Sequence, residues 1–346
     1  MSETRLVAAC RCTPVDRTPA WFMRQAGRFL PEYRAVRKHH TLLDICADPE
    51  LTAEVTLQPI RRFGMDGAII FADILLPVVP MGIDLDFIPD VGPLIGNPVS
   101  SMSDVEALRP FNPHECVAPT LAALGLVREA LPRETALIGF AGAPFTLASY
   151  LIEGKPTRNF IKTKSFMYHE PAAFQALMEK LVTMTISYLT AQAEAGAQVL
   201  QLFDSWVGYL SAGDYRRYIK PHSSAIFDAL SELDCPTIHF GVGTGELLPD
   251  MSEAGGDVIG LDWRVPLDEG WSRIGREKGV QGNLDPTVLF APHDVLRASV
   301  ENILERANGR PGHIFNLGHG VTPKTPMDSI SVVLDTLRSW SSDRSS

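Results

Sequence analysis

Short apolar runs of strand length alternate with longer stretches of helical spacing along most of the chain. Strands that alternate with helices in this way are typically parallel, because each helix carries the chain back to the starting edge of the sheet. The pattern therefore predicts an α/β fold with a parallel sheet. Eight such runs are present, the first and seventh being weak: residues 20–23, 67–71, 136–140, 198–203, 237–240, 258–261, 279–281 and 314–317.

Three of the intervening helices have recognisable ends. One begins with Asp48 as its N-cap and Pro49 at the first helical position, and it ends at Gly64. A short polar side chain and then proline are preferred at a helix start, and glycine is preferred just past the last turn. Two further helices are predicted over residues 171–195 and 294–307, each with a glycine within two residues of its end.

The rest of the chain shows no second domain. Seven prolines in residues 77–113 predict a long loop with at most short strands. No repeat or low-complexity linker divides the sequence, so residues 19–340 are predicted to form one domain. Residues 1–18 are assigned to an N-terminal tail, and whether that tail is ordered stays open.

Composition excludes several classes of function. The 346 residues contain no apolar run near the roughly 20 residues that a membrane span needs, and residues 1–17 lack the pattern of a signal peptide. We therefore expect a cytoplasmic protein that does not bind membranes. Five scattered cysteines without a C-x-x-C pair indicate neither disulfides nor a thiolate zinc site. A net charge of −10 without a basic stripe argues against nucleic-acid binding, so any anionic ligand needs a locally basic site.

Polar residues follow most of the predicted strands. The carboxyl ends of the strands in a (β/α)8 barrel converge on one mouth, where essentially all active sites of that fold lie. Side chains far apart in sequence would then line one cleft. They are Arg24 and Arg28 after the first run, Asp73 after the second, Asp204 and Ser205 after the fourth, Asp262 after the sixth, Asn283 and Asp285 after the seventh, and His319 after the eighth.

Four arginines within fourteen positions form the most basic segment. They are Arg24, Arg28, Arg34 and Arg37. Guanidinium groups stay charged and hold carboxylates through paired hydrogen bonds, so the cluster suits a ligand with several carboxylates. A solvated basic surface, or structural ion pairs with Glu32, explains the same spacing equally well.

Asp73 lies within continuous apolar sequence, IIFADILL. A carboxylate at the end of a buried strand needs hydrogen-bond donors or becomes protonated. The donors can come from a ligand, but capping a helix or pairing with an arginine is the commoner arrangement. Both interpretations stay open at this point.

Three other segments carry weaker signals. Tyr150 comes one turn after the glycine- and proline-containing turn at 139–144, where a bulky ligand could approach the backbone, although ordinary helix packing explains it as well. Lys155, Arg158, Lys162 and Lys164 form a basic loop that is either a lid or plain surface. Ser205 and His319 invite a hydrolase triad, but no GxSxG elbow is present, so that hypothesis is set aside.

Seven stretches, WFMRQAGRFLPEYR, IIFADIL, IGFAGAPFTLASYLIEG, QLFDSW, GLDW, QGNLDP and NLGHGV, occur in this order between about residues 20 and 326. Together they resemble the uroporphyrinogen decarboxylase family. The resemblance implies a single (β/α)8 TIM barrel that forms a homodimer and uses no metal or organic cofactor. It also implies removal of four acetate carboxyl groups of uroporphyrinogen III as CO2 to give coproporphyrinogen III, in tetrapyrrole (haem) biosynthesis.

The same resemblance assigns roles to individual residues. Asp73, Arg24 and Arg28 match the catalytic positions, and the two arginines also match carboxylate-binding positions. Asp73 would hold the ring N–H groups and stabilise a pyrrole cation, while the proton donor stays open between an arginine, a bound water, His319 and Tyr150. The other residues that match substrate-binding positions are Gln25, Tyr33, Arg37, Tyr150, Phe203, Ser205 and His319.

Two rival functions share these features. A zinc-dependent corrinoid or thiol methyltransferase of the same superfamily needs an H-x-C pair to bind zinc, and here the corresponding stretch is His239-Phe-Gly241, without the thiolate. A non-catalytic tetrapyrrole carrier could use the same pocket, but a carrier has no need to stabilise a ring cation. The presence of both Asp73 and the arginine pair therefore argues against the carrier.

Overall fold

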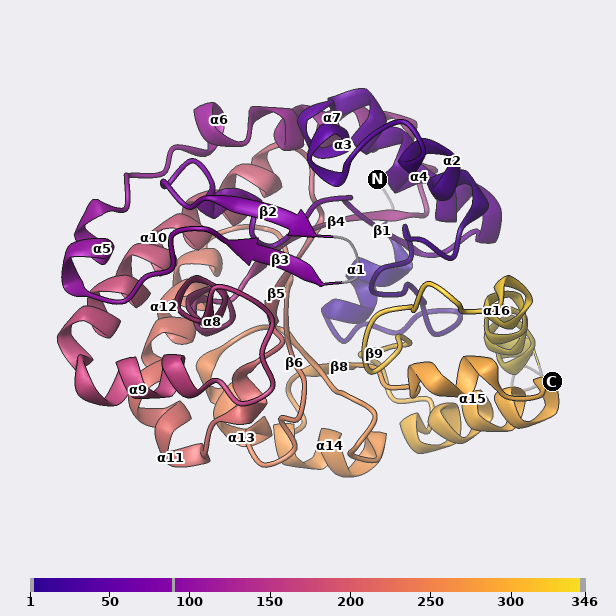
Figure 1. Ribbon diagram of the computed structural model, residues 1–346. Coiled ribbons are helices and arrows are strands. Elements are labelled where there is room, and N and C mark those ends of the chain that lie inside the picture. Colours follow the sequence, from indigo (N-terminus) through magenta and orange to yellow (C-terminus); the bar gives the residue numbers. More distant parts are fainter. Residues whose placement is uncertain (1–2, 89–90, 343–346) are drawn as a thin grey trace.

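The computed structural model describes residues 3–88 and 91–342. Its centre is a curled, seven-stranded parallel sheet surrounded by helices (Figure 1). The strand order is β1-β4-β5-β6-β7-β8-β9, so each strand lies beside the next one along the chain. The bounds are β1 (Gly67–Ile69), β4 (Ala136–Gly142), β5 (Val199–Asp204), β6 (Thr237–Gly241), β7 (Val258–Gly260), β8 (Gly279–Gln281) and β9 (His313–Ile314).

Seven of the predicted strands are confirmed, whereas the first, at residues 20–23, is not a regular strand. This segment makes a single bridge, between Ala20 and Phe315. The Phe315 amide donates to the Pro19 carbonyl at 2.9 Å on one side, and the Asp66 amide donates to the Ala20 carbonyl at 2.9 Å on the other. Proline at 19 has no amide to donate, and the chain turns into a left-handed conformation at Arg24, so pairing stops after a few residues.

Helices cover the convex face of the sheet. They are α4 (Pro49–Phe63), α7 (Ala118–Ala130), α10 (Pro171–Glu194), α12 (Lys220–Leu230), α13 (Leu248–Ala254), α14 (Leu267–Ile274), α15 (His293–Ala307) and α16 (Met327–Ser342). The three predicted helices are confirmed as α4, α10 and α15. Asp48 accepts hydrogen bonds from the amides of Glu50 and Leu51, and Gly64 ends α4 in the left-handed conformation. No helix in residues 3–88 and 91–342 is long and apolar enough to cross a bilayer.

A polar chain crosses the concave side of the sheet. The Trp21 indole donates to Gln281 at 2.9 Å, and the Gln281 amide donates to Gln201 at 3.0 Å. Gln201 belongs to β5 and Gln281 to β8, which are separated in the sheet by two strands, so their contact spans the interior. All three side chains are buried. The interior is therefore filled by side chains, as in barrel proteins generally.

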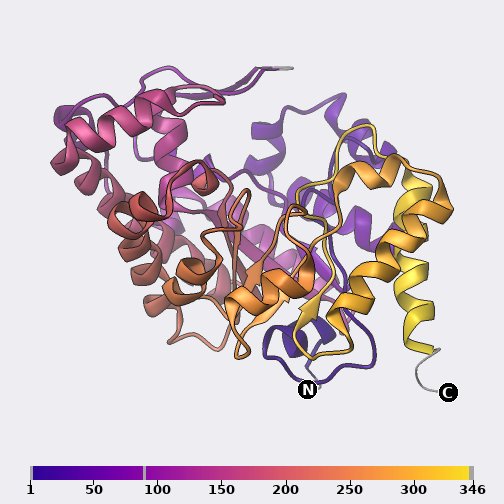
Figure 2. The ribbon, with the colours of Figure 1, turned by 90° about the horizontal axis from the view of Figure 1, so that it is seen from below.

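The two ends of the curled sheet carry different structures. At the amino end of the strands lies α1 (Arg5–Cys10), in which Leu6 and Ala9 are fully buried, so this part of the predicted N-terminal tail is a packed helix (Figure 2). The proline-rich loop lies at the other end and contains the antiparallel hairpin β2 (Leu85–Ile88) and β3 (Gly92–Ile95). Its strands are short, as the sequence predicted, but the segment also contains the helix α5 (Met102–Ala107), which was not predicted. The domain boundary at residue 19 stays a prediction.

The remaining helices are short and lie around the ends of the strands. They are α2 (Pro31–Arg37), α3 (Leu42–Ala47), α5 (Met102–Ala107), α6 (Pro113–Cys116), α8 (Pro144–Glu153), α9 (Ile161–His169) and α11 (Ala212–Asp214). Single turns of 3-10 or π-helix complete the set: η1 (Leu76–Val78), η2 (Val207–Tyr209), η3 (Tyr215–Ile219) and η4 (Pro286–Phe290).

Candidate active site

Asp73 follows β1 and is half-buried at the end of the sheet. Its Oδ1 accepts the Leu75 amide at 2.9 Å. No ion pair within the described part of the chain involves Asp73, so the carboxylate is not neutralised by a neighbouring base. Burial raises the pKa of Asp73, and the nearby charge of Arg24 opposes that rise. The site thus holds a carboxylate that has acceptor capacity left for a ligand.

Arg24 packs against the loop that follows β9, near the end of the chain. Its backbone is left-handed, with φ of 61°, an uncommon conformation for a residue with a β-carbon. The arginine stem packs on Gly320, where an added β-carbon would lie 2.6 Å from Arg24 Cδ. The glycine beside His319 is thus required for this close approach. Arg24 itself is exposed and forms no ion pair among the described residues.

Glu32 does not neutralise the arginine cluster, contrary to one of the two interpretations of the sequence. Its carboxylate pairs with Arg62 of α4 instead. Arg34 donates to two main-chain carbonyls, those of Arg28 and Phe29, at 2.8 Å each. Arg28 is exposed without an ion pair in the described structure. The segment therefore keeps guanidinium groups available for a ligand.

Arg37 and Tyr33 lie on α2, one turn apart. Arg37 Nη1 donates to the His40 carbonyl at 2.5 Å, and the guanidinium also forms a hydrogen bond with the Tyr33 side chain. Tyr33 is buried against Phe71, with ring centroids 5.4 Å apart, just before Asp73. Burial raises the pKa of Tyr33, whereas the charges of Arg37 and Arg28 oppose the rise. The two arginines therefore lie close to the segment that carries Asp73.

Gln25, a predicted substrate-binding residue, is turned into the protein. Its side chain is fully buried. Its Oε1 accepts the Phe22 amide at 3.0 Å, and its Nε2 donates to the Gly67 carbonyl at 2.9 Å. Because both ends of the amide are used by the backbone, Gln25 ties the irregular segment at residues 20–23 to β1. The structure therefore places it beneath the site.

Tyr150 of α8 feels the charge of Asp73, and its ring contacts Trp206. Burial and the Asp73 charge raise the pKa of Tyr150 to about 12. Its ring meets the Trp206 ring edge-on, with centroids 5.9 Å apart. The phenol therefore keeps its proton at neutral pH and can donate a hydrogen bond.

His319 follows β9 and is half-buried. Burial, followed by the charges of Arg24 and Arg264, lowers the pKa of His319 to about 4. The imidazole is therefore neutral at pH 7. Ser205, which follows β5, makes no hydrogen bond to His319 in the described structure, so the two do not form a hydrolase pair.

Phe203 lies in an aromatic group on β4, β5 and β6. Its ring contacts Phe140 at 5.5 Å and Phe240 at 5.9 Å between centroids, both edge-on. It is only partly buried, so one side of the ring remains available. Phe203 precedes the strand end by one residue and is two residues from Ser205, so it forms an apolar wall close to the mouth.

Sequence reasoning missed a second polar pair at the strand ends. Asp204, the last residue of β5, is fully buried, and its Oδ1 accepts the Thr146 hydroxyl at 2.9 Å. Thr146 also accepts the Trp206 amide at 3.2 Å. Thr146 lies one turn before Tyr150 on α8, and Trp206 contacts Tyr150. The available signal was the Asp204 carboxylate, but the apolar PFTLAS stretch did not indicate its partner.

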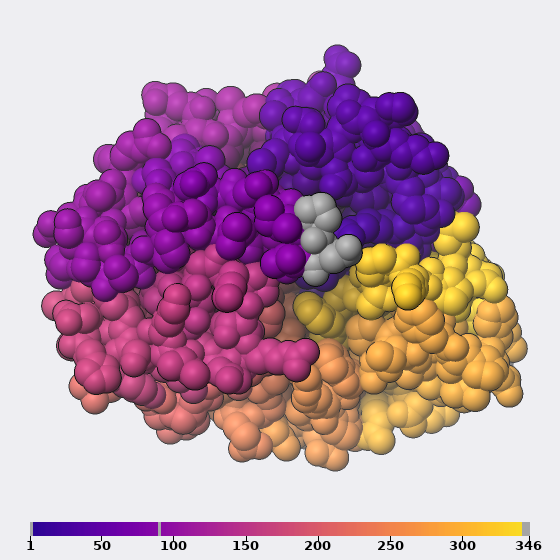
Figure 3. Space-filling model, viewed as in Figure 1, coloured from indigo at the N-terminus to yellow at the C-terminus, as the bar shows by residue number. Residues whose placement is uncertain are grey.

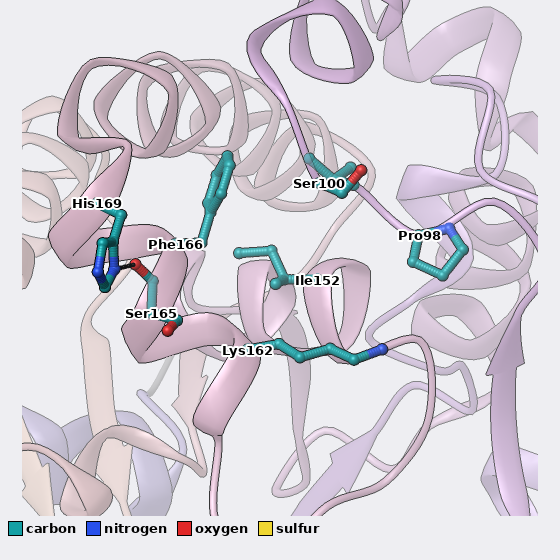
Figure 4. A pocket seen from close by; sticks show the side chains of 8 residues that line it. Pro98, Ser100, Ile152, Lys162, Ser165, Phe166 and His169 are labelled. Atoms are coloured by element: carbon teal, nitrogen blue, oxygen red, sulfur yellow. Dashed lines mark hydrogen bonds between the residues drawn. The ribbon is translucent and has the colours of Figure 1, made fainter.

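The basic loop at 155–164 borders two hollows. The first lies beside Tyr150 and Trp206, is also lined by Lys155, Thr157 and Phe160, and is too small to admit a water molecule. A groove of about 530 Å³ lies farther out, between the loop at 98–100 and helices α8 and α9 (Figure 4). None of the predicted substrate-binding residues lines that groove. The strand-end face is also hollowed near its centre, beside the yellow C-terminal segment (Figure 3).

The described residues contain no group of three or more His, Cys, Asp and Glu side chains arranged to hold a metal ion. His239, the zinc-ligand position of the rival function, is fully buried on β6 against Phe227. Burial lowers the pKa of His239 to about 3. Gly241 stands where the methyltransferases need a thiolate.

Comparisons with known proteins agree with this arrangement. Solved structures of low sequence identity show the fold alone: a methyltransferase from Methanosarcina mazei has a TM-score of 0.74 at 21% identity, covering 97% of this chain and 98% of its own. A B12-independent methionine synthase from a Shewanella species has a TM-score of 0.58 at 12% identity, covering 89% and 90%.

Relatives of much higher identity share the whole chain. Uroporphyrinogen decarboxylase from Sorangium cellulosum is 52% identical over 97% of this chain and 96% of its own. The enzyme of the same name from Thermus thermophilus is 51% identical over 96% and 97%. The family model described as uroporphyrinogen decarboxylase (URO-D) matches residues 1–340. The chain therefore belongs to the uroporphyrinogen decarboxylase family.

Proposed function

We propose that this chain is a uroporphyrinogen decarboxylase that uses Asp73 to stabilise a cation on its substrate. Relatives of that name match nearly the whole chain at about half identity. The observation that carries the proposed mechanism is the Asp73 carboxylate itself. It lies half-buried at the strand ends, receives one amide hydrogen bond and pairs with no cation among the described residues.

The reaction needs an electron sink. When an acetate side chain loses CO2, the electron pair of the broken C–C bond stays on the methylene carbon. Protonation of the adjacent pyrrole α-carbon creates a cation that accepts this pair. The methylene carbon then takes a proton to become methyl, and the ring proton is released, so each CO2 leaves with net uptake of one proton. No cofactor is required for this sequence.

Asp73 supports that cation by position and charge. The two oxygens of the Asp73 carboxylate can accept several hydrogen bonds, and the Leu75 amide uses only one of these positions. The others can accept the pyrrole N–H groups. A fixed negative charge in a poorly hydrated site stabilises developing positive charge more than water does. The raised pKa of Asp73 in the free protein reflects the cost of burying this charge alone, and a cation on the substrate would reverse it.

The arginines bind the substrate carboxylates in this proposal. Arg24 and Arg28 are exposed guanidinium groups, and Arg37 has donors engaged by the His40 carbonyl and by Tyr33. Arg24 also lies near Asp73, where it can place the departing carboxylate beside the cation. Phe203 and Ser205 border the same mouth from β5. Gln25 contributes indirectly, because it fixes the segment that precedes Arg24.

The pKa shifts bear on the proton donor. His319, with its pKa lowered to about 4, carries no imidazolium proton at neutral pH. Tyr150, with its pKa raised to about 12, keeps its phenol proton but releases it reluctantly. Both residues therefore suit hydrogen bonding to the substrate better than proton transfer. That leaves an arginine or a bound water as the group that passes the proton to the ring.

We further propose a closed barrel, a homodimer and a cytoplasmic location. The hydrogen bonds of residues 19–21 to Phe315 and Asp66 support closure of the sheet into an eight-membered barrel. The family resemblance supports a homodimer that works in the cytoplasm on a free porphyrinogen, away from nucleic acid and membranes.

Anaerobic incubation of the purified protein with uroporphyrinogen tests the function directly. Chromatography of the oxidised products counts the carboxyl groups, and we expect loss of four per molecule without added metal. Recovery of bound but unchanged uroporphyrinogen would identify a carrier instead. Stoichiometric zinc in the purified protein, together with methyl transfer to a thiol, would favour the methyltransferase.

A further inference from the structure

Arg264 lies in the loop after β7 and is held by a single buried carboxylate. Asp262 is almost completely buried, and its Oδ1 accepts the Arg264 amide at 2.9 Å. Its Oδ2 accepts Arg264 Nη1 at 2.6 Å and also receives the Gly243 amide. Asp262 therefore fixes both the backbone and the guanidinium of Arg264.

The neighbouring ring fixes the plane of the same guanidinium. The central carbon of the Arg264 guanidinium lies 4.1 Å from the centroid of the Trp263 ring. Stacking on an aromatic face is favourable for arginine and restricts its rotation. The Arg264 side chain nevertheless stays 51% exposed, and in the described structure only Nη1 donates to a protein acceptor. Two further nitrogens keep their donors for a ligand.

The loop that carries Arg264 adjoins the candidate active site. An added β-carbon on Gly318 would lie 2.4 Å from the Trp263 nitrogen, so the turn before His319 packs directly on this loop. Asn283 after β8 donates to the Asp262 carbonyl at 2.8 Å and to the Val265 carbonyl at 2.7 Å. Consistent with this closeness, Arg24 and Arg264 both lower the pKa of His319.

Arg264 lies on a different side of the mouth from the other candidate arginines. Arg24, Arg28 and Arg37 all come from one short segment at the beginning of the chain. A porphyrinogen carries carboxylates on every pyrrole ring, so cations from one segment cannot reach all of them. The net charge of −10 makes a local cation on the other strands more important for binding.

We propose that Arg264 is a substrate-binding residue that holds a peripheral carboxylate of the porphyrinogen on the β7 side of the mouth. The inference rests on the proposed function for the identity of the ligand. A pre-oriented guanidinium with two open donors matches the paired oxygens of a carboxylate. Asp262 acts behind it as the group that orients the arginine.

Arg264→Gln tests this assignment with the least disturbance. Glutamine keeps a donor for Asp262 but removes the charge and the fork. We expect the KM for uroporphyrinogen to rise on the order of tenfold, the size of one lost charge-assisted hydrogen bond, while kcat stays within about twofold. Arg264→Lys restores the charge without the fork and should give an intermediate KM.

Arg306→Gln is the matched control. Arg306 also donates Nη1 to one carboxylate, Asp268, at 2.7 Å, and its side chain is 37% exposed, but it lies on α15 away from the strand ends. Its KM should equal that of the wild type. Thermal unfolding of all variants shows whether loss of the Asp262 partner changes folding, since a purely structural role would lower Tm and leave KM unchanged.

Binding of uroporphyrin, the oxidised ring with the same carboxylates, provides a readout without turnover. Quenching of tryptophan fluorescence should give a Kd about tenfold higher for Arg264→Gln than for the wild type. Wild-type binding without decarboxylation would contradict the proposed function alone. Unchanged Kd and KM in Arg264→Gln, with normal wild-type turnover, would overturn the role of Arg264 alone.

Discussion

Asp73 and Asp204 are two carboxyl groups at the ends of strands in one sheet, and their surroundings differ. Asp73 is half-buried, receives a main-chain amide and lies in the field of Arg24. Asp204 is fully buried, receives the Thr146 hydroxyl, and its Oδ2 has no hydrogen-bond partner among the described protein atoms. Burial raises the pKa of both carboxyl groups.

The difference shows how partners decide what a buried acid does. Burial raises the pKa of Asp204 to about 7. The charge of Asp204 in turn contributes to the raised pKa of Tyr215. No cation of the described structure pairs with Asp204, so burial raises its pKa unopposed by any base, and its Oδ1 serves to fix Thr146. Asp73 lies near the charge of Arg24 and is half-buried at the strand ends, so its carboxylate can stabilise a cationic state of the substrate. Asp204 therefore has a structural role, whereas Asp73 is available for catalysis.

Exchanging each acid for its amide should separate the two roles most strongly. Asp73→Asn is expected to lower kcat roughly 10²- to 10³-fold, because the amide removes the charge opposite the ring cation but still accepts the Leu75 amide. Asp204→Asn should lower kcat by less than about fivefold, since the asparagine oxygen can still accept the Thr146 hydroxyl. Single-turnover decarboxylation under anaerobic conditions measures both. Comparable losses in the two variants would remove the distinction.

Stability against pH sharpens the comparison for Asp204. Its pKa rises from the ordinary 3.8 to about 7 on folding, so between these values the folded state binds more protons than the unfolded state. Stability is therefore lost as pH rises from about 4 to 7, by an amount on the order of a few kcal/mol. Asp204→Asn should flatten this decline in thermal unfolding between pH 5 and 8.

Asp268→Asn gives the control for that measurement. Arg306 lowers the pKa of Asp268, so its contribution has the opposite sign: it is present above the ordinary pKa and is lost as pH falls below it. This variant should leave the decline between pH 5 and 8 as it is in the wild type. A decline of equal size in Asp204→Asn would show that other groups cause it.

Removing the Thr146 hydroxyl should produce the smallest effect. Thr146→Val has nearly the same volume, but it leaves Asp204 without a donor and the Trp206 amide without an acceptor. We expect a loss of about 1–3 kcal/mol in the free energy of unfolding. Because Trp206 contacts Tyr150, kcat should also fall a few-fold, and Thr146→Ser should restore both. Urea denaturation and steady-state rates measure the two effects.

The sequence predicted the parts of the fold that depend on repeating patterns. Alternation of apolar runs and helical spacing identified the strands from β1 to β9 in the parallel sheet, and Asp48 and Gly64 identified the ends of α4. It overestimated the run at 20–23, because apolar residues are buried equally well in an irregular segment. Burial is visible in a pattern, whereas regular pairing depends on the neighbouring strands.

The sequence could indicate single residues of the site, but not the contacts between side chains from different elements. Asp73 and Arg24 were found because a charge at a strand end is conspicuous. Gln25 was assigned to the substrate, since nothing in the sequence shows that its amide bonds the backbone of a segment forty residues away. The roles of Thr146 and Arg264 depend on side chains from other strands, and such pairs become visible only when the chain is folded.

The contact between Arg24 and Gly320 has a consequence for synthesis of the protein. Nearly three hundred residues separate the two, yet the arginine stem rests on the glycine. A chain still emerging from the ribosome thus has its main cationic side chain without the surface that supports it. The contact that supports the Arg24 side chain can therefore form only after residue 320 has been made.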